Sequence, residues 1–225
     1  MNVSPGEEST SRSLIYFPIV HNQADMGAFS ESIRQASLER LGRSGWKRKL
    51  EVIDRFWTEI ERTIDRFSLS FSQVRIYQDG LPVSGREVQI VEELARAGSR
   101  NYALLQRLIR RGAEVVGTES LELLLEEYEL VKRALGPGRA SGARRTERSS
   151  SASLLRRRDK FIAKRINDTL LPGEVGIVFL GMLHSLEPWL DKDIQVTYPM
   201  HRPPHSKESA GEAQDSAEQR KRRGK

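Results

Sequence analysis

The chain has 225 residues, of which 37% are hydrophobic, and a formal net charge of +6. This length suffices for one domain with a hydrophobic core, and the absence of cysteine excludes disulfide bonds and thiolate metal sites. Residues 1–12 lack the basic and apolar regions of a signal peptide, and no apolar run approaches the roughly 20 residues of a membrane span. We therefore expect a cytoplasmic protein without a membrane segment, in which residues 1–12 are disordered.

The first third of the chain alternates short apolar runs with helical patterns. Residues 13–20 are predicted to form a buried strand, because the run is short and rich in β-branched and aromatic residues. Helices are predicted over 29–42 and 45–67, where apolar residues recur at helical spacing. A second strand is predicted over 70–78, ending at the turn signal that Asp79 opens.

The middle of the chain continues this alternation. Residues 86–98 and 101–112 are predicted to form two helices that each end at a glycine. Residues 113–120 contain a third strand, which leads into a helix that ends near residue 135. Residues 136–153 are dense in Gly, Ser and Arg and are predicted to form a mobile loop.

The last part of the chain completes an α/β pattern. Its predicted elements are a helix, a buried strand, a short helix and a final strand, over residues 154–170, 174–181, 182–190 and 194–200. Strands that alternate with helices and are almost continuously apolar are typical of a largely parallel central sheet flanked by helices. We therefore predict one α/β domain over 13–203, followed by a disordered tail over 204–225.

Residues that commonly bind metals follow four of the predicted strands. His21 follows the first strand, Asp79 the second, Glu119 the third and His184 the buried strand over 174–181. Because ligands bind at the carboxyl ends of parallel strands, we expect these side chains to converge on one edge of the sheet. Imidazoles and carboxylates together suit a divalent ion such as Mn²⁺, Fe²⁺, Co²⁺ or Zn²⁺. A metal-free acid/base site uses the same residue types.

Each of these residues also has a structural interpretation. Asp79 is a common turn residue before Gly80, and Glu119 suits the first turn of the helix that follows it. His21 can cap a following helix, and His184 can be a hydrogen-bonded histidine of the core. The prediction of a site therefore depends on the coincidence of such residues at several strand ends.

Three motifs resemble those of the Tiki/TraB-like superfamily, whose relatives include erythromycin-esterase-like and ChaN-like proteins. They are FLGMLH at 179–184, PIVH at 18–21 and RRRDKFIAKRI at 156–166. The resemblance implies an α/β domain with paired histidines, intervening acids and an Arg-Asp pair on a helix, which in this sequence are His21, His184, Asp79, Glu119, Arg158 and Asp159. Because some members of the superfamily are metal-dependent hydrolases, the resemblance also implies hydrolase activity.

Two classes of function follow from these patterns. The first is a metal-assisted hydrolase of a small molecule or peptide, in which His21, His184 and one acid hold the ion while another carboxylate activates water. Arg158 would then neutralise an anionic substrate or an oxyanion. The alternative is a non-catalytic module that binds a protein or nucleic acid through its basic loop over 136–153 and its tail over 204–225. The sequence has no glycine-rich phosphate loop, which argues against a nucleotide-dependent enzyme.

Overall fold

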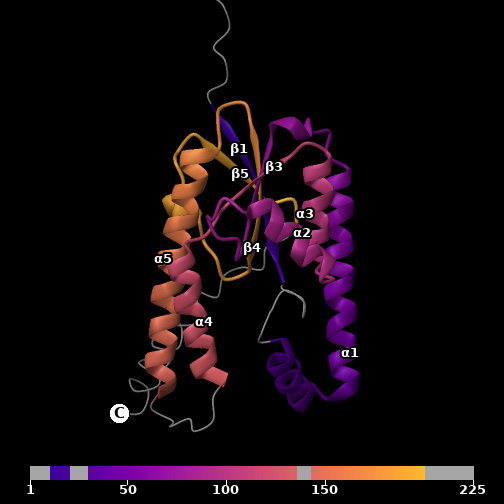
Figure 1. Ribbon diagram of the computed structural model, residues 1–225, viewed down its shortest axis with the longest axis vertical. Coiled ribbons are helices and arrows are strands. Elements are labelled where there is room, and N and C mark those ends of the chain that lie inside the picture. The colour runs from indigo at the N-terminus through magenta and orange to yellow at the C-terminus, as the bar shows by residue number, and fades with distance from the viewer. Residues whose placement is uncertain (1–10, 21–29, 136–142, 201–225) are drawn as a thin grey trace, which may run out of the picture.

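Five parallel strands form one sheet at the centre of the molecule (Figure 1). The structure is a computed structural model that describes residues 11–20, 30–135 and 143–200. The strand order is β3-β2-β4-β1-β5. The strands are β1 (Arg12–Ile19), β2 (Val74–Gln78), β3 (Glu114–Val116), β4 (Val175–Gly181) and β5 (Ile194–Thr197). The predicted α/β domain with a largely parallel central sheet is therefore confirmed.

Helices cover both faces of this sheet (Figure 1). The α-helices are α1 (Ser30–Asp65), α2 (Glu87–Arg96), α3 (Arg100–Arg110), α4 (Leu121–Leu135) and α5 (Ala143–Thr169), and the short 3₁₀ helices are η2 (Phe71–Gln73) and η3 (Glu187–Trp189). One face is covered by α1, α2 and α3, and the other by α5 with α4 beside it. None of the helices in the described ranges combines the length and the apolar character that spanning a membrane demands.

The central strand β4 contributes to both hydrophobic cores, because successive side chains of a strand point to opposite faces. Ile177 and Phe179 pack in the core that α1, α2 and α3 share with the sheet. Val178 and Leu180 pack in the core beneath α5. All four side chains are completely buried. A strand covered on both faces explains why the sequence of β4 is almost continuously apolar.

Helix α1 joins two predicted helices across a sharp bend. The prediction placed separate helices over 29–42 and 45–67, whereas α1 runs through both segments with a non-helical residue at Gly42. Gly42 has φ 68° and ψ 174°, a backbone conformation that essentially only glycine adopts. The chain therefore changes direction at this residue without a connecting loop.

Two predicted segments differ in the structure. The predicted loop over 136–153 is wrong for residues 143–153, which form the first turns of α5. All glycines and the proline of that loop precede residue 143, so the remaining sequence contains no helix breaker. The predicted helix over 182–190 is reduced to the 3₁₀ helix η3, because Pro188 has no N–H to continue a helix from the preceding turn.

The chain ends differ slightly from the prediction. The first strand begins at Arg12, within the segment that was predicted to be disordered, because this side chain is held by Asp191 and Asp193. Residues 1–10 and the predicted tail over 204–225 lie outside the described residues. The basic tail and residues 136–142 of the basic loop, on which the alternative function depends, therefore lie outside the described residues as well.

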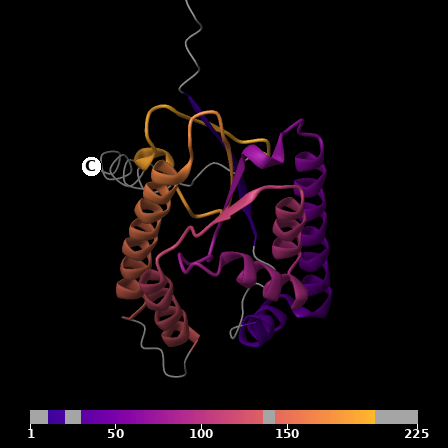
Figure 2. The ribbon, with the colours of Figure 1, turned by 45° about the horizontal axis from the view of Figure 1, so that its top comes forward.

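The helical layers extend past the carboxyl ends of the strands (Figure 2). The lower parts of α4 and α5 lie on one side of this end of the molecule, and α1, α2 and α3 lie on the other. The residues that follow β2, β3 and β4 therefore lie between two helical walls, at the edge of the sheet where parallel α/β proteins bind ligands.

Candidate active site

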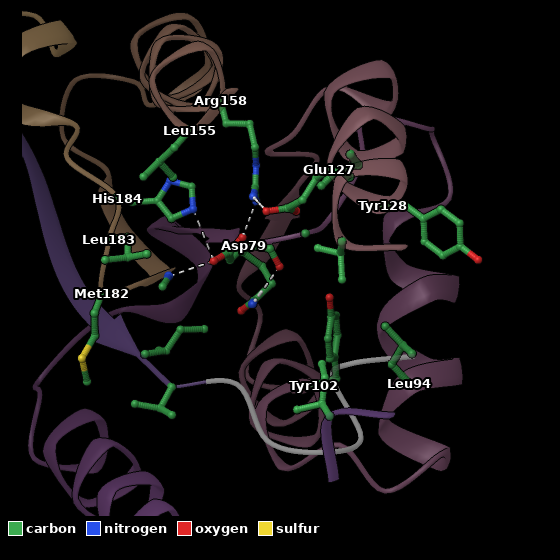
Figure 3. Close-up of a pocket in the computed structure, with 18 of the residues that line it drawn as sticks. Asp79, Leu94, Tyr102, Glu127, Tyr128, Leu155, Arg158, Met182, Leu183 and His184 are labelled. Atoms are coloured by element: carbon green, nitrogen blue, oxygen red, sulfur yellow. Dashed lines mark hydrogen bonds and ion pairs between the residues drawn. The ribbon is translucent and has the colours of Figure 1, made fainter. Parts of the chain in front are cut away.

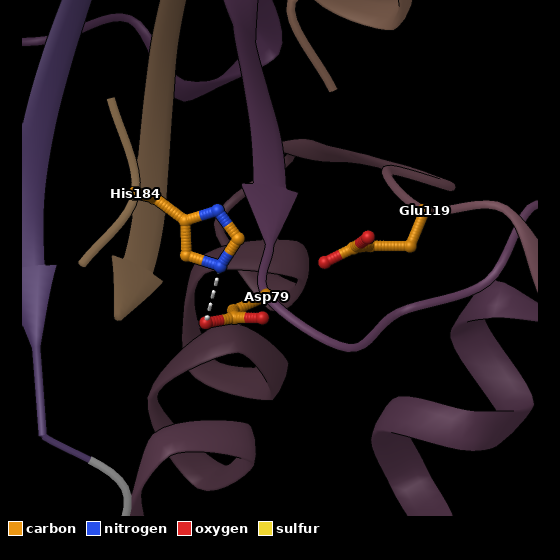
Figure 4. Close-up of side chains that lie close together, drawn as sticks. All are labelled: Asp79, Glu119 and His184. Atoms are coloured by element: carbon orange, nitrogen blue, oxygen red, sulfur yellow. Dashed lines mark ion pairs between the residues drawn. The ribbon is translucent and has the colours of Figure 1, made fainter. Parts of the chain in front are cut away.

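Three of the residues predicted from strand ends meet at this edge of the sheet (Figure 4). One possible ligand atom from each of Asp79, Glu119 and His184 lies within 4.8 Å of those of the other two. All three side chains are buried. Arg158 joins them from α5, whereas His21 lies outside the described residues. The structure thus brings together three of the four residues that follow the predicted strands, with Arg158 in contact with two of them.

Asp79 follows β2 directly and is held by the main chain of β4. Its N–H donates to the carbonyl of Phe179 at 2.8 Å, and the N–H of Gly181 donates to its Oδ2, also at 2.8 Å. Its other oxygen, Oδ1, accepts from Nη2 of Arg158 at 2.7 Å. Both carboxylate oxygens are therefore engaged, which distinguishes Asp79 from a simple turn residue.

Glu119 is positioned by close contact between two loops. The N–H groups of Thr118 and Glu119 both donate to the carbonyl of Leu81 at 2.9 Å, and the N–H of Val83 donates to the carbonyl of Glu119 at 2.9 Å. A Cβ atom at Gly117 would lie only 2.7 Å from Cα of Val83, so this approach requires glycine. The loop after β3 thus places the Glu119 side chain inside the protein rather than on the surface of α4.

Arg158 connects the acidic residues. Its Nε and Nη2 donate to the two oxygens of Glu119 at 3.1 and 2.5 Å, and Nη2 also donates to Asp79. Its Nη1 donates to Glu127 of α4 at 2.6 Å. All three guanidinium nitrogens therefore contact carboxylates. This geometry does not support the prediction that Arg158 neutralises an anionic substrate or an oxyanion.

His184 forms a short hydrogen bond with Asp159 of α5. Nδ1 of His184 lies 2.6 Å from Oδ1 of Asp159, whose Oδ2 accepts from the N–H of Ser185 at 3.2 Å. On the other side of the ring, Nε2 lies 3.6 Å from Oδ2 of Asp79. The imidazole is thus oriented by one carboxylate and faces a second.

Burial and neighbouring charges change the proton affinities at the site. Burial lowers the pKa of His184, but the hydrogen bond to Asp159 and the charge of Asp79 outweigh this effect and raise the pKa above its ordinary 6.5. Burial raises the pKa of Glu119 above 4.5, and the opposing effect of Arg158 is smaller. Both groups therefore hold protons more tightly than they do in water, as groups that exchange protons in active sites often do.

A pocket of about 780 Å³ opens beside these residues (Figure 3). Asp79, Arg158 and His184 lie on one side of it, and Leu94 and Tyr102 lie on the other. Further apolar side chains line the pocket from several elements, and they include Ile33, Val131, Leu155, Met182 and Leu183. A mostly apolar pocket of this size with a few convergent polar groups is typical of a small-molecule site.

The cluster of Asp79, Glu119 and His184 could hold a divalent metal ion. Carboxylate oxygens and an imidazole nitrogen are suitable ligands for Mn²⁺, Fe²⁺, Co²⁺ and Zn²⁺. Nη2 of Arg158, however, contacts the carboxylates of Asp79 and Glu119. A metal ion bound to both of these carboxylates would therefore displace this nitrogen. The residues fit a metal by their type, with Arg158 as the competing cation.

Two polar residues of the pocket do not follow from the sequence patterns. Glu127 is one of several acidic residues of α4, and only the packing of α4 against α5 distinguishes it from Glu126, which pairs with Arg157 at the surface. Gln78 is the last residue of β2 and is completely buried beside the pocket. Its position directly before Asp79 is the only sequence signal that could have identified it.

Comparisons with known proteins identify no relative. None of the family models, curated proteins and solved structures compared with the chain matches it. The resemblance to the Tiki/TraB-like superfamily stays a prediction from the sequence motifs, and the site is interpreted from its own chemistry.

Proposed function

We propose that this protein is a hydrolase in which His184, oriented by Asp159, removes a proton from the attacking water. The observation that carries this proposal is the 2.6 Å hydrogen bond between Nδ1 of His184 and Oδ1 of Asp159, beside a pocket of about 780 Å³. A carboxylate that accepts the proton of Nδ1 fixes the tautomer in which Nε2 accepts a proton. The buried pair therefore has the arrangement of a general base and its orienting acid.

Water is the nucleophile that fits the residues of the pocket. No Ser, Thr or Cys is among the described residues that line it, and the chain has no cysteine at all. A nucleophilic hydroxyl or thiol of the protein is therefore not part of the proposal. The reaction is hydrolysis of an ester or amide bond in a small molecule or peptide.

The two carboxylates on either side of His184 stabilise the imidazolium that forms during the proton transfers. When His184 takes a proton from water, Asp159 stabilises the resulting imidazolium through Nδ1. Asp79, at 3.6 Å from Nε2, adds further stabilisation of the positive charge. The imidazolium then returns the proton to the leaving group. Arg158 acts as a positioning residue, because it holds Asp79 through the hydrogen bond to Oδ1.

A metal-assisted form of this hydrolysis is the second candidate. It is favoured by the three ligand types of Asp79, Glu119 and His184, which meet within 4.8 Å. A bound divalent ion supplies Lewis-acid polarisation and lowers the pKa of a water ligand. Some members of the superfamily that the sequence resembles are metal-dependent hydrolases, which is consistent with this candidate.

A panel of chromogenic acyl esters and anilides tests the proposal. We expect the wild-type protein to hydrolyse at least one of them, and the variant His184→Gln to lose this activity. Asp168→Asn is the control, because Asp168 lies on α5 with Asp159, does not line the pocket and, among the described residues, pairs with the exposed Lys164. Equal activity of the wild type and His184→Gln, or no activity on any substrate, contradicts the proposal.

Dialysis against EDTA separates the two candidates. Activity that survives the chelator and is unchanged by added Mn²⁺ or Zn²⁺ supports the metal-free mechanism. Activity that is lost and then restored by one of these ions supports the metal-assisted mechanism instead.

A further inference from the structure

We propose that the pocket binds apolar molecules that are neutral or positively charged, and that it discriminates against anions of the same size. The inference extends the proposed function to the class of substrate, and it rests on that function only in treating the bound molecule as a substrate. Binding itself is measurable without turnover.

The charged residues in contact with Arg158 or His184, some of which line the pocket, carry a net negative charge together with these two residues. Asp79, Glu119 and Glu127 contact the guanidinium of Arg158, and Asp159 contacts His184. Of these four carboxylates, those of Asp79 and Glu127 line the pocket. With His184 neutral, these groups sum to a charge of −3, and with His184 and Glu119 both protonated they sum to −1. The sign is the same in each protonation state, so this side of the pocket attracts cations and repels anions.

Arg158 does not offset this charge toward a ligand. Its Nε, Nη1 and Nη2 donate to Glu119, Glu127 and Asp79, and only 4% of the residue is exposed. A ligand anion that bound to this guanidinium would have to displace one of these carboxylates, and displacement of Asp79 or Glu119 would leave a buried carboxylate without its cation.

Gln78 adds an acceptor to the same side. Its Nε2 donates to the carbonyl of Asp79 at 3.1 Å, which leaves Oε1 as the acceptor. Oε1 is buried and has no hydrogen-bond partner in the part of the chain that the structure describes. A buried acceptor without a partner is costly, and a donor from a ligand would relieve that cost. A ligand that donates hydrogen bonds therefore suits this wall better than one that only accepts them.

The remaining walls favour an apolar molecule. Leu94, Val131 and Leu155 line the pocket from three helices. Leu183 lies at the pocket with 76% of the residue exposed, and Met182 beside it is 37% exposed. Large apolar side chains that are exposed at a pocket commonly mark a binding surface.

Lys49 of α1 is, besides Arg158, a cation that lines the pocket. Its Nζ lies 5.3 Å from the centre of the Trp46 ring. Lys49 has no carboxylate partner among the ion pairs of the described residues, so it offers a second place where a ligand anion could bind. The variant Lys49→Gln shows whether anions use it.

Calorimetric titration with three matched probes tests the inference. The probes are 1-naphthylmethylammonium, 1-naphthylmethanol and 1-naphthoate, which share one ring system and differ in charge. At pH 7.5 and moderate salt we expect the ammonium and the alcohol to bind at least about tenfold more tightly than the carboxylate. Lys49→Gln should weaken only the residual binding of the carboxylate.

Variants of the pocket and their matched controls locate the effect. Glu127→Gln should lower the preference for the ammonium over the carboxylate by about threefold or more, whereas Glu126→Gln should not, because Glu126 pairs with Arg157 at the surface. Leu183→Ser should weaken the binding of all three probes to a similar degree. Leu171→Ser, at an exposed leucine that does not line the pocket, should leave the binding of all three unchanged.

The outcomes separate this inference from the proposed function. Equal or tighter binding of 1-naphthoate overturns the inference, as does a lack of binding by all three probes. If the probes bind with the expected preference while no ester or anilide is hydrolysed, the ligand class stands and the hydrolase proposal fails. If hydrolysis depends on His184 but the preference for charge is absent, the hydrolase proposal stands and the inference about the ligand class fails.

Discussion

Two arginines at opposite ends of the sheet each bind acidic side chains, but the two clusters differ in burial. Arg12 lies at the amino end of β1 and contacts Asp191 and Asp193 at 2.9 and 2.7 Å. These two side chains are 53% and 41% exposed. Arg12 also donates to the carbonyls of Asn167 and Leu170 near the end of α5, where a positive charge is favourable. We call these residues the Arg12 cluster.

The Arg158 cluster, formed by Arg158, Asp79, Glu119, Asp159 and His184, lies at the carboxyl end. The carboxylates of Asp79 and Glu119 are 6% and 0% exposed. The cluster has more acids than cations, includes a histidine and lies at a pocket. Burying several charges costs free energy. The Arg12 cluster joins β1 to the end of α5 while its two acidic side chains stay largely exposed, so a purely structural connection does not require buried carboxylates. Excess buried acids, a titratable imidazole and a pocket together set the Arg158 cluster apart from the Arg12 cluster, and these are features expected of a functional site.

The largest expected difference between the clusters is catalytic. Asp159→Asn should lower kcat/KM by about 10²- to 10⁴-fold, because the amide no longer fixes the tautomer of His184 or stabilises its imidazolium. Asp193→Asn in the Arg12 cluster should leave kcat/KM unchanged. Steady-state kinetics on the best substrate of the panel measures both values, and a similar loss in the two variants would remove the distinction.

The second difference concerns the removal of the arginine from the buried cluster. Arg158→Met should lower the free energy of unfolding by about 3–5 kcal/mol, because it leaves Asp79 and Glu119 buried without their cation. Urea denaturation followed by circular dichroism measures this change. A loss below about 1 kcal/mol would mean that these carboxylates are solvated or protonated in the folded protein.

A smaller loss is expected for the corresponding change in the Arg12 cluster. Arg12→Met should lower the free energy of unfolding by about 1–2 kcal/mol, since Asp191 and Asp193 can turn to water and only the carbonyls of Asn167 and Leu170 lose a buried donor. The same denaturation experiment applies. If Arg12→Met were as destabilising as Arg158→Met, the exposure of the partners would not explain the difference.

The smallest expected effect is the pH dependence of stability, which has opposite signs in the two clusters. The folded-state pKa of His184 is raised above 6.5, so its contribution to stability is present below pH 6.5 and is lost as pH rises through the folded-state pKa. The hydrogen bond from Arg12 lowers the pKa of Asp193 below 3.8, so its contribution is present above pH 3.8 and is lost as pH falls through the lowered value.

Two variants separate these contributions. His184→Gln should remove the decline in the free energy of unfolding above pH 6.5, and Asp193→Asn should reduce the decline in acid. Denaturation at a series of pH values measures both. A wild-type protein whose stability rises from pH 6.5 to 8 would contradict the sign assigned to His184.

The position of the site could be predicted because parallel strands end at one edge of the sheet. Asp79, Glu119 and His184 each follow a strand, so the topology alone brings them together. The contacts of Arg158 could not be predicted, because they depend on how α4 and α5 pack and on the rotation of each helix. In the structure Arg158 donates to three carboxylates, whereas it was expected from the sequence to neutralise a substrate anion or an oxyanion.

The secondary structure shows the same division between local and tertiary effects. Short apolar runs identified the strands, since burial on both faces leaves a clear pattern in the sequence. The start of α5 at Ala143 could not be predicted from composition, because the segment after Gly142 is rich in Ser and Arg yet contains no residue that breaks a helix. The bend at Gly42 likewise could not be predicted, because it depends on the backbone conformation that this glycine adopts in the structure.

The pH profile of kcat/KM most directly tests whether His184 and Asp159 form the general base. The account predicts that activity rises with pH with a midpoint above 6.5, because the base must be neutral and its pKa is raised. Asp159→Asn should move the midpoint of its residual activity to lower pH, since the hydrogen bond that His184 donates to Asp159 is the main cause of the raised pKa, while Asp168→Asn should not move it. A midpoint at or below 6.5, or one that is the same in Asp159→Asn as in the wild type, would contradict the account.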